Sequence, residues 1–316
     1  MSVRTRTRAA LLVALGLVAT LAIALAPGRG DAVGKVTTPI RTPNDGPVAT
    51  AAMGKGTPYC GRPMRKPDGT PWTCTFSDYF DGTKLNSSKW RLITSRESSF
   101  GDDRNDCYVN SRYNVAVNSG VLKMVTRRNL VPFKCGVGRH EYTTTATSPL
   151  VSTFSKFEQN RGRFQFRAKF PLTSQKGIQA ALWLYPDSGG LGPVTSGEID
   201  IAEWYSVYPR RVIPYLHYTT GVLGGVLGSK EVTNVNCIVK RVDQWHTYTL
   251  EWTSDKLVIS YDGVPCLTNT SGVILGQFSR QYFLNMMMAQ GVHQNPPTAL
   301  TPLRSMAQID WVRVWK

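Results

Sequence analysis

The amino-acid sequence predicts an all-β protein, in which many short antiparallel strands pack as one large sandwich. The clearest strand covers residues 162–170 (GRFQFRAKF), where apolar side chains alternate with Arg163, Gln165, Arg167 and Lys169. This period of two is typical of an antiparallel strand with one buried face. Helical periodicity over eleven or more residues is hard to find after the N-terminal segment, and 28 Gly and 19 Pro fit a turn-rich fold.

Four further segments extend the strand prediction. Residues 247–252 and 256–263 form a predicted hairpin with a short polar turn between them, and residues 307–315 form a C-terminal strand. Residues 177–186 (GIQAALWLYP) are nearly all apolar, as expected of a central strand that is covered on both faces.

The N-terminal segment has the layout of an export signal. Arg4, Arg6 and Arg8 precede an uncharged apolar run at 9–26. Residues 1–32 are therefore predicted to be a signal peptide or, if they are not cleaved, an N-terminal anchor. The chain is expected to be secreted, with association with the cell envelope as the alternative.

The rest of the chain divides by composition. Residues 33–72 are rich in Pro, Gly and Thr and are predicted to be a linker or a loosely attached arm. Residues 73–316 are predicted to form the folded domain, and the protein is expected to be a monomer.

The predicted export of the chain bears on the interpretation of its six cysteines. An even number in an exported chain suggests disulfides, whereas the lack of a C-x-x-C motif argues against a metal site. Six cysteines allow 15 pairings. We expect each cysteine to pair with its neighbour, because each such pair brackets a short segment: Cys60–Cys74, Cys107–Cys135 and Cys237–Cys266.

The formal net charge of +16 narrows the choice of partners. A basic exported protein can bind an anionic polysaccharide, an anionic envelope or nucleic acid, and a solvated basic surface is the simplest alternative. The sequence has no dense tract of Lys and Arg and no nucleic-acid motif, so nucleic acid is not expected.

The most informative stretch is TSGEIDIAEWY at 195–205. Glu198 and Asp200 are two residues apart and share one face of an ideal strand, whereas Glu203 would turn to the other face. Acids among apolar residues are costly to bury and usually have a function. A one-residue β-bulge between Asp200 and Glu203 would return Glu203 to the face of Glu198.

Paired carboxylates on one face suit glycoside hydrolysis. A retaining enzyme needs a nucleophile and an acid/base whose carboxyl groups lie about 5–5.5 Å apart. Two long Glu side chains can close much of the gap along the strand, and the shorter Asp200 can hydrogen-bond between them. Three close carboxylates do not all ionise easily, so at least one pKa is expected to rise.

The motif and its surroundings resemble glycoside hydrolase family 16, the laminarinase-like and lichenase-like β-glucanases. GEIDIAE is similar to the E-x-D-x-x-E signature of that family, in the form with two residues before the last Glu that is typical of the laminarinase-like branch. Segments in the family's order extend the resemblance over most of the chain after residue 74: FSDYFDGTKLNSSKW, NRGRFQFRAKFPL with AALWLYP, QWHTYTLEWTSDKLVISYDG and IDWVRVW.

The resemblance implies an antiparallel β-jelly-roll sandwich with a concave substrate cleft. It implies that Glu198 is the nucleophile, that Glu203 is the acid/base and that Asp200 supports both. No cofactor is expected to be required. Tyr79 stands where the family usually has an acidic residue, and with Asp310 that position resembles a structural calcium site, so Tyr79 argues against the metal.

Four further residues are predicted to contact substrate: Trp183, His217, Gln290 and Trp204. Trp183 and His217 match residues that lie near the cleft of the family, and Gln290 is a candidate on a later strand. Trp204 follows Glu203 directly and should point away unless the bulge turns it.

The sequence thus predicts a secreted retaining endo-β-glycanase acting on internal β-1,3-glucan bonds. Relatives that act on galactan or an anionic polysaccharide are the alternative, as is a transglycosylase that uses the same covalent intermediate. A non-catalytic, lectin-like glycan-binding sandwich is the alternative outside the enzymes.

Overall fold

The computed structural model describes residues 57–97, 106–187, 197–223, 226–274, 277–291 and 295–316. The chain divides into two compact units, Met1–Gly46 and Pro47–Lys316, and all the described residues belong to the second. The predicted signal peptide (1–32) and most of the predicted linker lie outside them. Among the described residues, no helix combines the length and the apolar character needed to cross a membrane.

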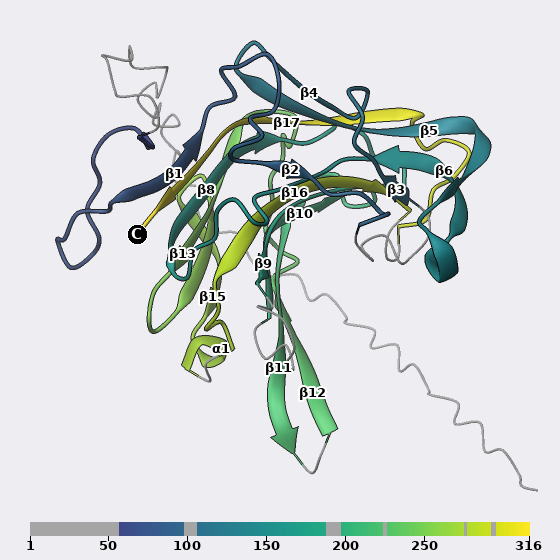
Figure 1. The fold of residues 1–316 in the computed structure, drawn as a ribbon. Helices are drawn as coiled ribbons and strands as arrows, with labels where there is room; N and C mark the ends of the chain where they lie inside the picture. Colours follow the sequence, from purple (N-terminus) through teal and green to yellow (C-terminus); the bar gives the residue numbers. More distant parts are fainter. Residues whose placement is uncertain (1–56, 98–105, 188–196, 224–225, 275–276, 292–294) are drawn as a thin grey trace, which may run out of the picture. The chain divides into compact units, whose positions relative to one another are not determined.

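The larger of two sheets has ten strands (Figure 1). Its spatial order is β15 (Val264–Asn269), β14 (Leu257–Tyr261), β13 (His246–Trp252), β8 (Gly162–Lys169), β17 (Arg304–Trp315), β5 (Val121–Cys135), β6 (Tyr142–Ser148) and β3 (Asp106–Tyr108), while β1 (Cys74–Asp78) pairs with β17 and β4 (Val115–Asn118) with β5. All neighbours are antiparallel except β3 and β6.

The smaller sheet has seven strands and carries the acidic motif. Its order is β12 (Val226–Thr233), β11 (Ile213–Leu223), β10 (Glu198–Tyr205), β9 (Ile178–Pro186), β16 (Tyr282–Gln290), β7 (Leu150–Ser152) and β2 (Arg91–Leu92). The helical segments in the described part of the chain are the four-residue α1 (Ser271–Ile274) and a 3-10 turn at Gly138–His140. The predicted all-β fold is confirmed.

The two sheets enclose one hydrophobic core. On β8 the predicted alternation holds, because Phe164, Phe166 and Ala168 are fully buried in this core while the basic residues of the strand, at the alternate positions, are only partly buried. β9 is buried along almost its whole length, as its apolar sequence predicts. The predicted hairpin is the antiparallel pair β13–β14.

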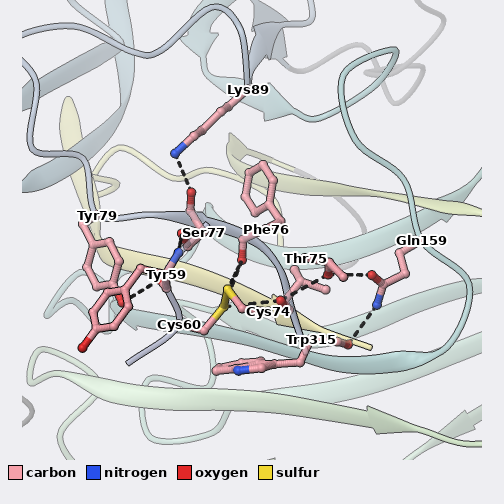
Figure 2. The surroundings of a disulfide bond; sticks show 11 residues. Tyr59, Cys60, Cys74, Thr75, Phe76, Ser77, Tyr79, Lys89, Gln159 and Trp315 are labelled. Carbon is pink, nitrogen blue, oxygen red and sulfur yellow. Dashed lines mark hydrogen bonds between the residues drawn. A yellow bond between two sulfur atoms is a disulfide. The ribbon is translucent and has the colours of Figure 1, made fainter. Parts of the chain in front are cut away.

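The three predicted disulfides are all present: Cys60–Cys74, Cys107–Cys135 and Cys237–Cys266. Figure 2 shows the first, which joins the segment before β1 to β1 itself. Hydrogen bonds reinforce this link, since Tyr59 N–H donates to Ser77 Oγ at 2.9 Å and the Tyr79 hydroxyl donates to the Tyr59 carbonyl at 3.0 Å. Tyr59 and Cys60 are thus held against β1 and the residues that follow it, ahead of the predicted domain start at 73.

Candidate active site

The acids lie on β10, which contains the predicted β-bulge. Its register against both neighbouring strands is regular up to Asp200 and shifts before Glu203. Ile201 and Ala202 are consecutive, yet both are fully buried in the core between the sheets. Ile201 is the extra residue, and it returns Glu203 to the face of Asp200. The predicted bulge is therefore confirmed.

We call the outer surface of the seven-stranded sheet around Glu198, Asp200 and Glu203 the carboxylate face. In Figure 1, the strands β9, β10 and β16 of this sheet lie together, in agreement with their order in the sheet. Rows of paired side chains cross it from strand to strand. One row runs through Tyr215, Asp200, Trp183, Asn285 and Ser152.

The glycine that precedes the motif is required by close packing. A Cβ atom at Gly197 would lie 1.8 Å from the carbonyl oxygen of His217 on the neighbouring strand. The backbone of Gly197 is also held from two sides, because its N–H donates to the Gln277 carbonyl at 3.0 Å and its carbonyl accepts from the Tyr282 hydroxyl at 2.6 Å. These contacts fix the start of β10 and therefore the position of Glu198.

Glu203 is buried and is held by two hydrogen-bond donors. The Gln179 side-chain amide donates to Glu203 Oε1 at 2.7 Å, and the Tyr205 hydroxyl donates to the same oxygen at 3.1 Å. Gln179 also donates to the Tyr205 hydroxyl at 3.0 Å, so the three side chains form a closed triangle. This triangle leaves the other carboxyl oxygen of Glu203 free of these donors.

Asp200 lies between the two glutamates and interacts with both. It is buried, and its carboxyl is within hydrogen-bonding reach of Glu198. His217 Nε2 lies 3.2 Å from Asp200 Oδ2, and the other ring nitrogen lies 3.6 Å from Glu231. The first contact is electrostatic rather than a well-aligned hydrogen bond, since Asp200 Oδ2 has no hydrogen-bond donor among the described residues.

Burial dominates the electrostatics of the three acids. It raises the pKa of Glu198 to about 9, with a further contribution from the charge of Asp200. It raises the pKa of Glu203 to about 7, against the opposing effect of the Tyr205 hydroxyl. The pKa of Asp200 is also well above its ordinary value, because of burial and the nearby Glu203. The expected rise is confirmed, and the site holds protons at neutral pH.

Trp183 lies on the carboxylate face, directly across from Asp200 on the neighbouring strand. It packs in a small cluster outside the main core with Ile93, Tyr108 and Leu150. Its ring meets Tyr185 edge to face, with ring centroids 5.7 Å apart. Of the residues predicted to contact substrate, Trp183 and His217 thus lie beside the three acids.

Trp204 and Gln290 are not brought to this face. Trp204 is fully buried between the sheets and stacks on Phe170. Gln290 pairs with Ile178, and its side chain lies on the side of β16 that faces the core. Both polar atoms of this side chain are buried without a hydrogen-bond partner among the described residues. The structure therefore corrects both substrate-contact predictions, because strand alternation turns these side chains away from the acids.

Three residues of the site were not singled out from the sequence: Gln179, Tyr205 and Tyr215. Tyr205 follows Glu203 at a spacing of two, so strand periodicity could have found it. Tyr215 precedes His217 at the same spacing and stacks on its ring, with centroids 5.6 Å apart. Gln179 belongs to another strand, and its contact depends on the register between strands.

The two residues that resemble a calcium site both have partners within the protein. Asp310 forms an ion pair with Arg167, so a positive group already occupies its carboxyl. The Tyr79 hydroxyl donates to a backbone carbonyl, and the Arg313 guanidinium lies 5.2 Å from the Tyr79 ring. No group of three potential metal-binding side chains is found in the part of the chain that the structure describes.

Comparison with known proteins agrees with this geometry. The sequence profile of Glycosyl hydrolases family 16 matches residues 103–312, which is more than half of the chain. The chain belongs to glycosyl hydrolases family 16. The match includes β10 and all three acids, and it confirms the family resemblance of the motif.

The individual relatives are distant. The chain is 26% identical over 206 residues to an endo-1,3-1,4-beta-glycanase of Rhizobium meliloti, covering 60% of this chain and 41% of that protein. It is 26% identical over 265 residues to a glucan endo-1,3-beta-glucosidase of Niallia circulans, covering 76% and 37%. The chain thus spans about two fifths of the length of these family 16 relatives.

Solved structures confirm the jelly-roll sandwich. The catalytic domain of an endo-1,3-beta-glucanase (laminarinase) from Thermotoga petrophila is 25% identical, with a TM-score of 0.64 over 78% of this chain and 98% of that one. The endo-beta-1,3-glucanase from Pyrococcus furiosus shares the fold, with a TM-score of 0.65 at 21% identity over 80% and 97%.

Proposed function

We propose that this family 16 chain is an exported endo-β-glycanase that cleaves internal β-1,3-glucan bonds with retention of configuration. The observation that carries the proposal is the bulge at Ile201, which gathers Glu198, Asp200 and Glu203 on one face. The endo-1,3-1,4-beta-glycanase of Rhizobium meliloti and the glucan endo-1,3-beta-glucosidase of Niallia circulans, both similar to this chain, support a β-glucan as substrate. The three disulfides support an oxidising location outside the cytoplasm.

The chemistry follows from the two glutamates. Glu198 attacks the anomeric carbon and forms a covalent glycosyl–enzyme bond, while Glu203 gives its proton to the departing glycosidic oxygen. Glu203 then removes a proton from water, and the resulting hydroxide displaces Glu198 and restores both residues. Its pKa of about 7 suits a group that must first donate and later accept a proton.

Glu198 must be ionised to attack, although its own pKa in the free site is about 9. Asp200 can accept the proton of Glu198, because its carboxyl is within hydrogen-bonding reach of Glu198 and its pKa is also raised. In the reactive state the shared proton resides on Asp200, which donates a hydrogen bond to the Glu198 carboxylate. His217 Nε2 lies 3.2 Å from Asp200 Oδ2, beside that pair.

The roles are tested with variants and a defined panel of polysaccharides. The wild-type chain should convert laminarin, a β-1,3-glucan, into short oligomers whose new reducing ends are first released as the β anomer. Glu198→Gln should fold but lose turnover by at least about 10³-fold. Full activity of Glu198→Gln, or first release of the α anomer, would contradict the mechanism. Cleavage of a galactan in place of laminarin would contradict the proposal that β-1,3-glucan is the substrate.

A small nucleophile distinguishes the two glutamates. Azide should restore activity to Glu198→Ala and yield an α-glycosyl azide, because azide replaces the missing carboxylate. In Glu203→Ala, azide should instead attack the covalent intermediate from the opposite side and yield a β-glycosyl azide. The reverse pattern would exchange the two assignments.

A further inference from the structure

The outer face of the ten-stranded sheet is strongly basic along three neighbouring strands. Core residues alternate with outward side chains on β8, β17 and β5. Seven of these outward side chains are cationic: Arg163, Arg167, Lys169, Arg304, Arg313, Lys123 and Arg127. Asp310 is the one acid at the outward positions of these strands in the described residues.

Three of the seven cations already have partners within the fold. Arg163 forms an ion pair with Glu251, and Arg167 forms one with Asp310. Arg313 is nearly buried, with its guanidinium 3.8 Å from the centre of the Trp311 ring. These contacts give the three residues a role in holding the sheet together, so they need no ligand.

The other four cations form what we call the basic patch: Lys123, Arg127, Lys169 and Arg304. None of them makes an ion pair within the part of the chain that the structure describes. Asp243 lies close enough to Lys169 to sense its charge, but the Asp243 carboxylate is paired with Arg241. Within the described residues, the basic patch therefore carries four cations that no ion pair neutralises.

The arrangement of the patch brings like charges together. Arg304 and Arg127 are directly opposite each other on β17 and β5. Lys169 and Lys123 pair with the same residue, Gln308, from its two sides. Like charges opposite each other destabilise a sheet, so the fold itself gains nothing from this placement. The placement does suit an anionic partner that bridges the strands.

Aromatic rings lie at both ends of the basic patch. The Trp245 ring has Lys169 Nζ 4.9 Å from its centroid, and the Tyr113 ring has the Arg127 guanidinium at 5.8 Å. Tyr113 is 61% exposed, although a large aromatic side chain is usually buried. Flat rings offer an apolar surface to the C–H face of a sugar, while Arg and Lys bind carboxylate or sulfate groups.

We propose that the basic patch, with Trp245 and Tyr113, is a second, non-catalytic binding site for an anionic polysaccharide. Lys123 and Arg127 are four residues apart, about 13 Å along the strand, which is a length suited to a chain rather than to a single ion. The patch and the carboxylate face are on opposite outer surfaces of the sandwich. The chain can therefore hold an anionic polymer on one side while its active site works on the other. This site is independent of the hydrolytic activity proposed above.

The test measures binding without turnover, in the Glu198→Gln protein. The probe is immobilised polygalacturonate, and the measured quantity is the dissociation constant at low and at physiological salt. Lys123→Gln combined with Arg127→Gln should weaken binding by roughly tenfold at low salt. The matched control, Lys84→Gln with Lys256→Gln, removes the same charge from exposed positions elsewhere and should change binding less than twofold.

Two further measurements separate a glycan site from a general attraction to anions. Tyr113→Ala, which keeps the charge, should also weaken binding to polygalacturonate severalfold. In the protein with Glu198 restored, hydrolysis of neutral laminarin should be unchanged by the patch substitutions. Equal losses in the control pair, or no loss in Tyr113→Ala, would overturn the proposal. Tighter binding to duplex DNA or to vesicles containing phosphatidylglycerol, by the same residues, would overturn it in favour of another class of partner.

Discussion

The two outer faces of the sandwich present charge in opposite ways. On the carboxylate face, Asp200 and Glu203 are 3% and 7% exposed, and burial raises the pKa of both. On the basic patch, Arg127 and Arg304 lie directly opposite each other and remain partly or fully exposed. Both faces gather like charges on neighbouring strand positions, yet only the first removes them from water.

The difference indicates what each face can do. Buried acids resist ionisation, so protons are retained near neutral pH where a reaction can use them. Exposed cations stay charged and interact weakly with each other through water, so they can attract a polymer without a precise geometry. The carboxylate face is suited to chemistry, and the basic patch to adhesion.

The largest expected effect contrasts two tryptophans that lie on the two sides of the smaller sheet. Trp204→Ala leaves a cavity beside Phe170 in the core and should lower the free energy of unfolding by about 3–5 kcal/mol. Trp183→Ala should cost less stability, because its cluster is small, and should raise KM for laminarin. Urea denaturation and steady-state kinetics measure the two quantities. An unchanged KM in Trp183→Ala would remove that residue from the substrate site.

The next effect concerns the cost of burying Glu203. Its pKa is about 7 in the folded protein and near 4.5 when unfolded, so the folded state binds more protons between these values. The wild-type chain should therefore lose stability as the pH rises from about 4.5 through 7. Glu203→Gln should be more stable than wild type at pH 8, by on the order of 3 kcal/mol, and similar at pH 4. Chemical denaturation at both pH values checks this, and a gain that is equal at the two pH values would contradict it.

A smaller effect concerns the pH dependence of activity. Glu203 must be protonated at the start of the reaction, so kcat/KM should fall as the pH rises through about 7. Tyr205→Phe removes a hydroxyl that stabilises the Glu203 carboxylate, so the pKa should rise and the falling limb should move to higher pH by about half a unit. Tyr215→Phe is the matched control on the same face. A shift to lower pH in Tyr205→Phe would contradict the prediction that this hydroxyl stabilises the Glu203 carboxylate.

The smallest effect is expected at the basic patch. Arg304→Glu places an acid opposite Arg127 and should raise the free energy of unfolding by about 0.2–1 kcal/mol, because it replaces a like-charge pair with an ion pair. Arg304→Lys should give no such gain. Urea denaturation at low salt resolves the two variants. Loss of stability in Arg304→Glu would mean that the arginine pair supports the fold and is not kept for a ligand.

Much of the site could be predicted from the sequence, because it lies on one strand. The five-residue step from Glu198 to Glu203 conflicts with strand alternation, and a single bulge at Ile201 resolves the conflict without any other part of the chain. The prediction for Gln290 failed for a related reason. The prediction placed the Gln290 side chain on the substrate face without knowledge of how β16 pairs with β9. The observed register places Gln290 on the core side.

The sequence by itself determined the β class, the pairing of neighbouring cysteines and the grouping of three acids on one face. Each of these depends on neighbours in the chain: alternation of side chains, short spacing between cysteines, and one extra residue in a strand. Only the tertiary structure decided that Gln179 holds Glu203 and that Arg304 lies opposite Arg127. Both contacts join residues of different strands, and the register between strands is set by the packing of the whole sheet.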